Sequence, residues 1–146
     1  MCIRDRYYSF KGEFYDIPEL KLCPTPSKAV PILIGGHSKL ALKRAARIGD
    51  GWISAGITLD ETKEFIDQIN IFRKEYGTLD HPNYQFQVMG EAAYSPDGIK
   101  NLEDLGATEV IVAFRNAYEG GKDERTLDGM IAEMNWYAEE VINKSR

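Results

Sequence analysis

The stretch Pro31-Ile32-Leu33-Ile34-Gly35-Gly36 decides the fold. A short apolar run that ends in a glycine pair is typical of a strand buried in a parallel sheet. Ser38 follows two residues later and can cap a helix that runs to Ile48, where Gly49 ends it. A strand that leads directly into a helix is the repeating unit of an α/β protein.

The same alternation of strand and helix continues to the end of the chain. Further strands are predicted over residues 52–55, 84–89 and 109–114, and the last of these is the clearest strand in the sequence. Further helices are predicted over residues 58–76 and 95–105 and from about residue 126 onward. Residues 7–29 contain three prolines, which favours an extended loop with a short hairpin.

Four strand–helix units in this order predict a parallel sheet with helical crossovers. Two architectures fit. One is a small open sheet covered on both faces, and the other is half of a TIM-type (β/α)8 barrel, which needs about 250 residues to close. Since the chain has 146 residues, we expect a single domain over residues 7–146. The charged, aperiodic residues 1–6 are interpreted as a non-native leader.

Composition excludes several classes of function. The net charge of −5 argues against nucleic-acid binding, which needs a basic surface. No apolar run approaches the roughly 20 residues of a membrane span, and the first residues do not resemble a secretory signal. Two cysteines, Cys2 and Cys23, predict reduced thiols and a cytoplasmic location. The two histidines, His37 and His81, are isolated, so no metal site is predicted.

The glycine pair itself has a chemical use. Glycine allows a backbone to approach a ligand closely, and the start of a helix offers free N–H groups and a partial positive charge to a phosphate. Ser38 adds a hydroxyl. The spacing leaves two interpretations open, a phosphate-binding turn and a plain tight turn, because it matches neither a Walker A loop nor a dinucleotide fingerprint.

The neighbours of the glycine pair carry a family resemblance. A Pro24-Thr25-Pro26 lead-in precedes Pro31–Ser38, an Ala- and Arg-rich helix follows, and Gly49-Asp50-Gly51-Trp52 enters the next strand. This order resembles a hallmark of the luciferase-like oxidoreductases, which depend on a flavin or a deazaflavin. Phe10–Tyr15 also resembles the F-x-G-x-[FY]-[FY] loop of that family. The resemblance in sequence is specific over residues 10–56. Beyond them it lies only in the order of strands and helices.

The resemblance implies that the chain is the C-terminal half of a (β/α)8 barrel. It implies FMN or coenzyme F420 as the cofactor, bound where the strands end. It further implies that Gly35 and Gly36 hold the cofactor phosphate through backbone N–H groups and that Ser38 assists. His37 lies beside this turn, where it either touches the ligand or is an exposed loop histidine.

Five further residues lie near the expected site. Asp50 and Trp52 are features of the family whose expected role is structural, with Asp50 bonding a turn and Trp52 packing in the barrel. Ser54 and Gly56 follow the second strand and should face the mouth of the barrel. Arg115 comes just after the last strand and is placed there too, although a solvated arginine is the ordinary interpretation.

The resemblance implies an oxidoreductase, a monooxygenase or an F420-dependent reductase, acting on a small-molecule substrate. As a C-terminal fragment, the chain alone should be weakly active or inactive. No catalytic residue can be assigned, since the flavin ring carries the reaction in such enzymes. We expect a homo-oligomer or a missing N-terminal half as partner. The alternative is a non-catalytic α/β module for binding or assembly.

Overall fold

A computed structural model describes residues 6–21, 23–24, 26–115 and 124–145. Contacts separate residues 1–31 from residues 32–146, and each unit is described by itself. The first unit is an antiparallel hairpin of β1 (Tyr8–Lys11) and β2 (Asp16–Leu20), in which Phe10 pairs with Ile17. The hairpin predicted within residues 7–29 is therefore confirmed. One domain over residues 7–146 stays a prediction.

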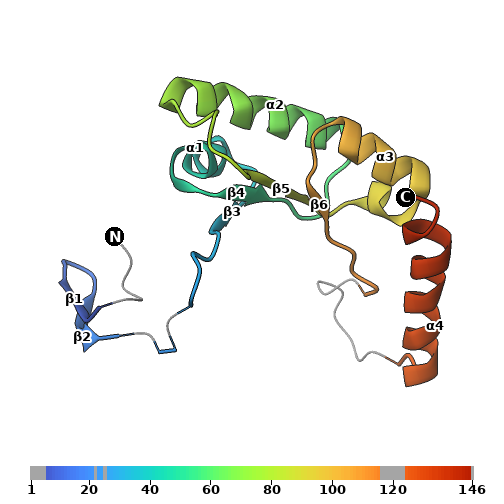
Figure 1. The fold of residues 1–146 in the computed structure, drawn as a ribbon, viewed down its shortest axis with the longest axis horizontal. Helices are drawn as coiled ribbons and strands as arrows, with labels where there is room; N and C mark the ends of the chain where they lie inside the picture. The colour runs from blue at the N-terminus through green and yellow to red at the C-terminus, as the bar shows by residue number, and fades with distance from the viewer. Residues whose placement is uncertain (1–5, 22, 25, 116–123, 146) are drawn as a thin grey trace. The chain divides into compact units, whose positions relative to one another are not determined.

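The second unit contains a four-stranded parallel sheet whose order is β3-β4-β5-β6 (Figure 1). The α/β fold with parallel strands is therefore confirmed. Its strands are β3 (Leu33–Gly35), β4 (Gly51–Ile53), β5 (Gln85–Val88) and β6 (Glu109–Val110). Its helices are α1 (Lys39–Ile48), α2 (Leu59–Tyr76), a 3₁₀ turn (Glu91–Tyr94), α3 (Pro96–Asp104), and α4 (Leu127–Tyr137) with a π-helical turn (Ala138–Ile142).

The strand order distinguishes the two architectures that the sequence left open. In a doubly wound sheet the order reverses at a switch point, whereas here each strand lies beside the next strand in the sequence. Helix α1 packs on α2 and on the first two strands of the sheet, and α2 also contacts α3. Figure 1 shows α1 and α2 on the same side of the sheet. This is the arrangement of four successive units of a (β/α)8 barrel.

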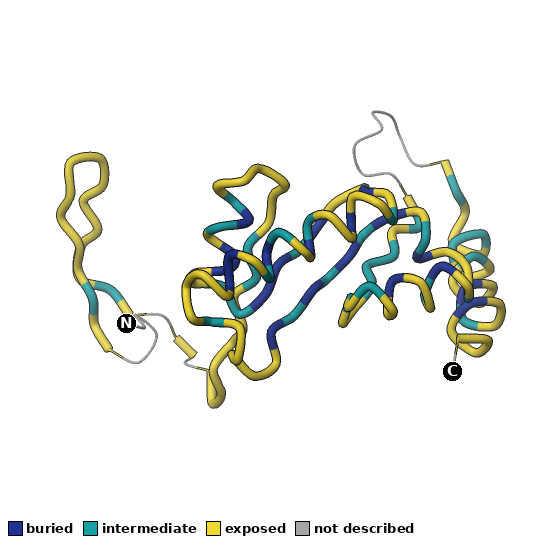
Figure 2. The backbone as a smooth tube through the Cα atoms, turned by 90° about the horizontal axis from the view of Figure 1, so that it is seen from above, coloured by how far each residue is buried: buried dark blue, intermediate teal, exposed yellow. Residues whose placement is uncertain are grey.

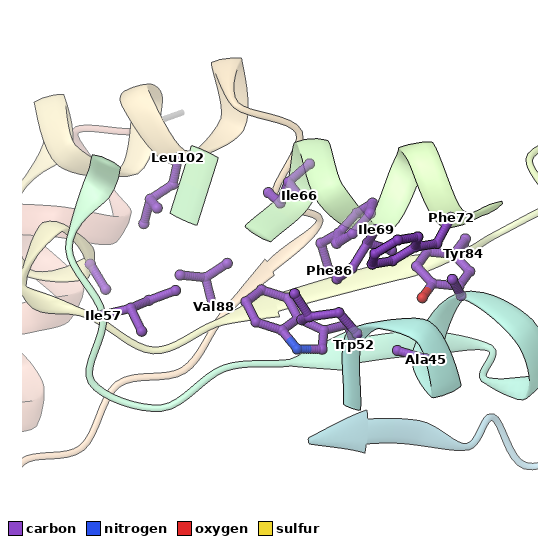
Figure 3. Close-up of a cluster of buried hydrophobic side chains, with 13 residues drawn as sticks. Ala45, Trp52, Ile57, Ile66, Ile69, Phe72, Tyr84, Phe86, Val88 and Leu102 are labelled. Carbon is purple, nitrogen blue, oxygen red and sulfur yellow. The ribbon is translucent and has the colours of Figure 1, made fainter. Parts of the chain in front are cut away.

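Alternation along the strands gives the sheet two different faces. Trp52, Phe86 and Val88 are buried among helix residues on the covered face (Figure 3). Their neighbours along the strands therefore belong to the opposite face. There Gln87 pairs with Glu109 in register, and its amide nitrogen donates to the Glu109 carboxylate at 2.5 Å. In a barrel this second face would point to the interior.

The helices begin where the sequence signals place them. Ser38 accepts a hydrogen bond from the Ala41 N–H at 3.3 Å. Thr58 and Glu61 form a capping box, in which each side chain bonds the other residue's backbone N–H. Ser95 caps α3 with Pro96 in the first position. Since each cap satisfies backbone donors that the helix leaves open, these signals fix the helix starts.

The strands are shorter than predicted, and the last strand differs most. It was expected over residues 109–114, but β6 ends at Val110. Its partner β5 ends at Val88, whose carbonyl accepts from the Ile111 N–H at 2.8 Å. Beyond that point the Tyr94 hydroxyl donates to the Ala113 carbonyl and accepts from the Ala113 N–H. A side chain thus replaces the sheet partner. The sequence also predicts a loop that contains Gly120-Gly121, and this loop lies outside the described residues.

The burial pattern of α2 allows a direct test of the core (Figure 2). Ile69 is 0% exposed, whereas Ile71 on the same helix is 57% exposed. Replacing Ile69 with alanine should lower the free energy of unfolding by about 2–5 kcal/mol, because the cavity in a packed core cannot fully close. Ile71→Ala is the matched control and should change it by less than about 0.5 kcal/mol. Urea unfolding measures both, and equal losses would contradict the packing described here.

Candidate functional site

The glycine pair ends β3 and turns the chain into α1. Gly36 has a φ of 110°, in the left-handed region that side chains rarely adopt. A Cβ at this position would also lie 3.0 Å from the Cβ of Ala41. The turn therefore needs glycine at Gly36 both for its backbone conformation and for its packing on the helix.

The turn presents backbone donors at the start of α1. The Ser38 hydroxyl satisfies the Ala41 N–H, and the Leu42 N–H donates to the Ser38 carbonyl at 3.0 Å. The N–H groups of Lys39 and Leu40 have no acceptor within the helix, as at any helix start. Such a group of amides, with the helix dipole behind it, favours an anion. Gly35, Gly36 and Ser38, the predicted phosphate-binding residues, thus lie at a chemically suitable place.

Trp52 fixes this turn from the core. Its indole is fully buried, and its Nε1–H donates to the Gly36 carbonyl at 2.9 Å. At the other end of β3, the Asp50 carboxylate accepts from the Ile32 N–H at 2.8 Å, and the Asp50 N–H donates to the Ile32 carbonyl. The structural roles predicted for Asp50 and Trp52 are therefore confirmed, since together they fix both ends of the strand.

His37 has a specific environment, although its side chain is exposed. Its Nε2 accepts from the Ala55 N–H at 3.3 Å. The imidazole stacks on Phe65, with ring centroids 5.2 Å apart and planes 13° apart, and meets Trp52 edge-on at 6.1 Å. The residue is thus held between α2 and the loop after β4, which the sequence pattern did not indicate.

The residues after β4 divide into two roles. Ser54 is buried, and its hydroxyl accepts from the Met89 N–H at 2.9 Å, so it joins the ends of β4 and β5. Gly56 has a φ of 62° and lines a hollow beside the sheet. Both residues follow the carboxyl end of a strand, as predicted. Ser54, however, acts by bonding the backbone at the end of the neighbouring strand.

The hollow lies where β4, β5 and β6 end and has a volume of about 1040 Å³. Apolar groups and backbone dominate its lining, with Glu91 and Arg115 as the charged members in the described part of the chain. The lining comprises Ala55, Gly56, Ile57, Thr58, Leu59, Met89, Gly90, Glu91, Ala92, Tyr94, Ala113 and Arg115. Arg115 is thus placed at the mouth, as expected.

Sequence reasoning missed the contribution of the segment after β5 to this hollow. A Cβ at Gly90 would lie 2.2 Å from the Ile57 carbonyl oxygen, so the two loops approach through a glycine. Tyr94 forms another part of the wall through its two bonds to Ala113, and it packs edge-on against Tyr137. A glycine directly after a predicted strand was the available signal for Gly90. The tyrosine carried no local signal.

Two pKa shifts accompany this architecture. The Thr58 backbone N–H and hydroxyl both donate to the Glu61 carboxylate, which lowers the pKa of that group. Burial raises the pKa of Tyr137, whose hydroxyl donates to the Ala93 carbonyl at 2.8 Å. Glu61 also interacts electrostatically with His37 in the turn after β3, whereas Tyr137 bonds the segment after β5.

The described residues contain neither a candidate metal site nor a candidate membrane-spanning helix. No group of three His, Cys, Asp or Glu side chains in this part of the chain could hold a metal ion. Of the helices that the structure describes, none combines the length and the apolar character that crossing a membrane requires.

Comparison with known proteins supports the resemblance. The family model for luciferase-like monooxygenases matches residues 1–98. Uncharacterised proteins of Mycobacterium tuberculosis and Mycobacterium bovis are 42% identical over 138 residues, which cover 94% of this chain and 47% of theirs. The chain therefore spans about half the length of these relatives.

Two more distant proteins are also similar. A pyrimidine monooxygenase of Allorhizobium ampelinum is 36% identical over 55 residues, or 37% of this chain and 15% of its own. The solved structure of an F420-dependent secondary alcohol dehydrogenase with an F420-acetone adduct has a TM-score of 0.49 and 22% identity, covering 69% of this chain and 31% of that one.

The bond from Trp52 to the turn can be tested. Trp52→Phe removes the Nε1–H donor and leaves a small cavity, so the free energy of unfolding should fall by about 2 kcal/mol. Amide hydrogen exchange at Gly36, His37 and Ser38 should quicken more than exchange elsewhere. Trp136→Phe is the matched control, because Trp136 on α4 is 51% exposed. Unchanged exchange at the turn in Trp52→Phe would contradict the role assigned to this bond.

Proposed function

Because the chain belongs to the luciferase-like monooxygenase family, we propose that it holds the phosphate of FMN or coenzyme F420 in an oxidoreductase. Gly35 and Gly36 bind through backbone N–H groups, with Ser38 and His37 beside them. The observation that carries the proposal is the bond from Trp52 to the Gly36 carbonyl. That bond holds the turn open at the edge of the sheet where the hollow also lies.

The turn suits a phosphate better than it suits a neutral group. The first N–H groups of α1 and the positive end of its dipole meet there. Lys39 adds a formal positive charge at the first position of the helix. Gly36 keeps the approach free of a side chain, as the close Ala41 contact requires. These features support a terminal phosphate as the group bound.

The hollow suits the rest of the ligand. A mostly apolar cavity with a few polar groups is typical of sites for small molecules. Its volume of about 1040 Å³ leaves room for a ring system and a small substrate. When bound, a flavin or deazaflavin supplies the hydride chemistry, and the protein binds and orients it. In this proposal Arg115 and Glu91 provide polar contacts at the rim.

The proposed activity belongs to a longer assembly than this chain. Four parallel strands make half of a (β/α)8 barrel, and the mycobacterial relatives are about twice as long. We propose that the other strands complete the site and that residues 1–146 alone are weakly active or inactive. Weak binding of the phosphate group can still be measured on this chain, because the turn is built from residues 32–55.

Cofactor titration tests the phosphate-binding role. FMN should bind more tightly than riboflavin, which lacks the phosphate, by about tenfold or more, as measured by flavin fluorescence. Gly36→Ala should remove most of that difference, because it displaces the turn; tenfold corresponds to about 1.4 kcal/mol. Gly106→Ala is the matched control, since Gly106 also has a positive φ, 95°, but precedes β6. Equal affinity for FMN and riboflavin would refute the proposal.

A second candidate function, assembly without catalysis, has its own supporting observation. Leu127, Ile131 and Met134 are exposed and share one face of α4, as their spacing of four and three residues requires. Exposed apolar patches of this kind mark interaction surfaces. The sheet also has β3 and β6 at its edges, and edge strands readily pair with other strands.

Light scattering after size exclusion tests this second candidate. If α4 mediates assembly, replacing Leu127, Ile131 and Met134 together with lysine should reduce the measured mass to that of one chain. Ile71→Lys is the control, because it adds a charge to an exposed apolar site on α2. A wild-type chain that is monomeric at every concentration and binds FMN would favour the cofactor-binding function and exclude self-assembly.

A further inference from the structure

We propose that His37 is a positioning residue that couples the turn after β3 to the loop after β4 at the rim of the hollow. When a phosphate binds at the turn, His37 passes the resulting shift on to the wall of the hollow, where the cofactor ring is proposed to bind. The inference rests on the proposed function, because it concerns how the two parts of that site act together. The contacts that carry this role are between His37 and other residues of the protein, and they are distinct from any contact between His37 and the ligand.

The first observation is that the imidazole ring has a protein partner on one face and another at Nε2. The ring lies nearly parallel to Phe65 on α2, at 5.2 Å, and its Nε2 accepts from the Ala55 N–H at 3.3 Å. Stacking fixes the plane of the ring, and the hydrogen bond fixes its rotation within that plane. An exposed histidine held in this way has lost the freedom of an ordinary loop residue.

The second observation concerns what the ring connects. The described lining of the hollow includes Ala55 and Gly56 but none of Gly35–Ser38. His37 belongs to the turn, and its acceptor atom meets the backbone of Ala55. Trp52 reaches the same turn from the buried side, through the Gly36 carbonyl. The ring therefore provides a second connection, on the exposed side, between the phosphate turn and the rim.

The third observation is that the connection depends on the charge of the ring. Nε2 can accept only when His37 is neutral with its proton on Nδ1, and protonation makes both nitrogens donors. On α2, hydrogen bonds from Thr58 are the main cause of the lowered pKa of the Glu61 carboxylate, and the positive charge of a protonated His37 lowers it further. Lys39 follows on the same segment, and β4 and the loop after it contribute the uncharged Trp52 and Ala55. Acidification should therefore break the bond to Ala55.

Backbone NMR of the full 146-residue chain can test the coupling, with inorganic phosphate as the probe. In the wild type, phosphate should shift the amide signals of Gly36, Ser38 and Lys39 and, with the same dissociation constant, that of Ala55. His37→Phe keeps a ring against Phe65 but has no acceptor. In this variant the Ala55 response should disappear, and the affinity should fall about fivefold, as for one lost hydrogen bond.

His37→Gln is the rescue variant, because its amide oxygen can accept at about the reach of Nε2. It should restore the Ala55 response, which a purely structural role of the ring would not predict. An Ala55 response in His37→Phe equal to that of the wild type would overturn the inference. Loss of the response in His37→Gln with retention in His37→Phe would overturn it too, and would identify the stacking contact as the only link.

A ligand-free pH titration separates this inference from the proposed function. In the wild type, the Ala55 and Ser38 amide signals should shift together as His37 is protonated, and in His37→Gln both should stay flat through that range. If phosphate does not bind the wild type, the proposed phosphate-binding role of the turn is refuted. The ligand-free titration still tests whether His37 couples the turn to the loop after β4. An Ala55 signal that ignores His37 protonation would refute the coupling itself.

Discussion

The hydrogen bond from the Trp52 indole to the Gly36 carbonyl is the constraint on which the candidate site depends. A buried indole N–H needs a partner, since leaving it unpaired costs about 1–3 kcal/mol. The Gly36 carbonyl meets it in a turn where this residue adopts a φ of 110°. The tryptophan thus determines the direction of the turn, and the turn determines where the first N–H groups of α1 lie.

Side-chain hydrogen bonds of the same type connect other segments along the carboxyl edge of the sheet. Trp52 bonds the end of β3 from β4, and Ser54 accepts from the Met89 N–H at the end of β5. Tyr94 then bonds both backbone groups of Ala113 after β6. For each pair of neighbouring strands, a side-chain hydrogen bond therefore connects the segments at the strand ends. It takes the place of the backbone hydrogen bonds of the sheet. Loops that are tied in this way can border a hollow without losing their backbone hydrogen bonds.

How far the sequence predicted this site depends on the range of each interaction. The helix starts were predictable because Ser38, Thr58 and Glu61 act within three residues of their partners. The role of Trp52 followed from a family motif, and periodicity alone would not have given it. The contacts of His37 with Ala55 and of Tyr94 with Ala113 join residues 18 and 19 positions apart. Such pairs depend on strand register, which a single sequence does not specify.

The amino edge of the sheet shows a different use of polar groups. Arg73 is 6% exposed, donates to the carbonyls of Thr78 and Leu79, and lies 3.9 Å from the Tyr84 ring centroid. Burial raises the pKa of Tyr84 to about 12. The Thr78 hydroxyl bonds the Ala46 carbonyl at the end of α1.

These contacts at the amino edge fill space and close loops. In barrels, function belongs to the carboxyl edge and stability to the amino edge. In the four strands described here, the two edges also carry different kinds of residue. The carboxyl edge keeps glycines, backbone donors and a hollow, whereas the amino edge places a cation against an aromatic ring. Because the two sets of residues are separate, the loops that border the hollow can vary in sequence while the packing that orients β3 and β4 is preserved.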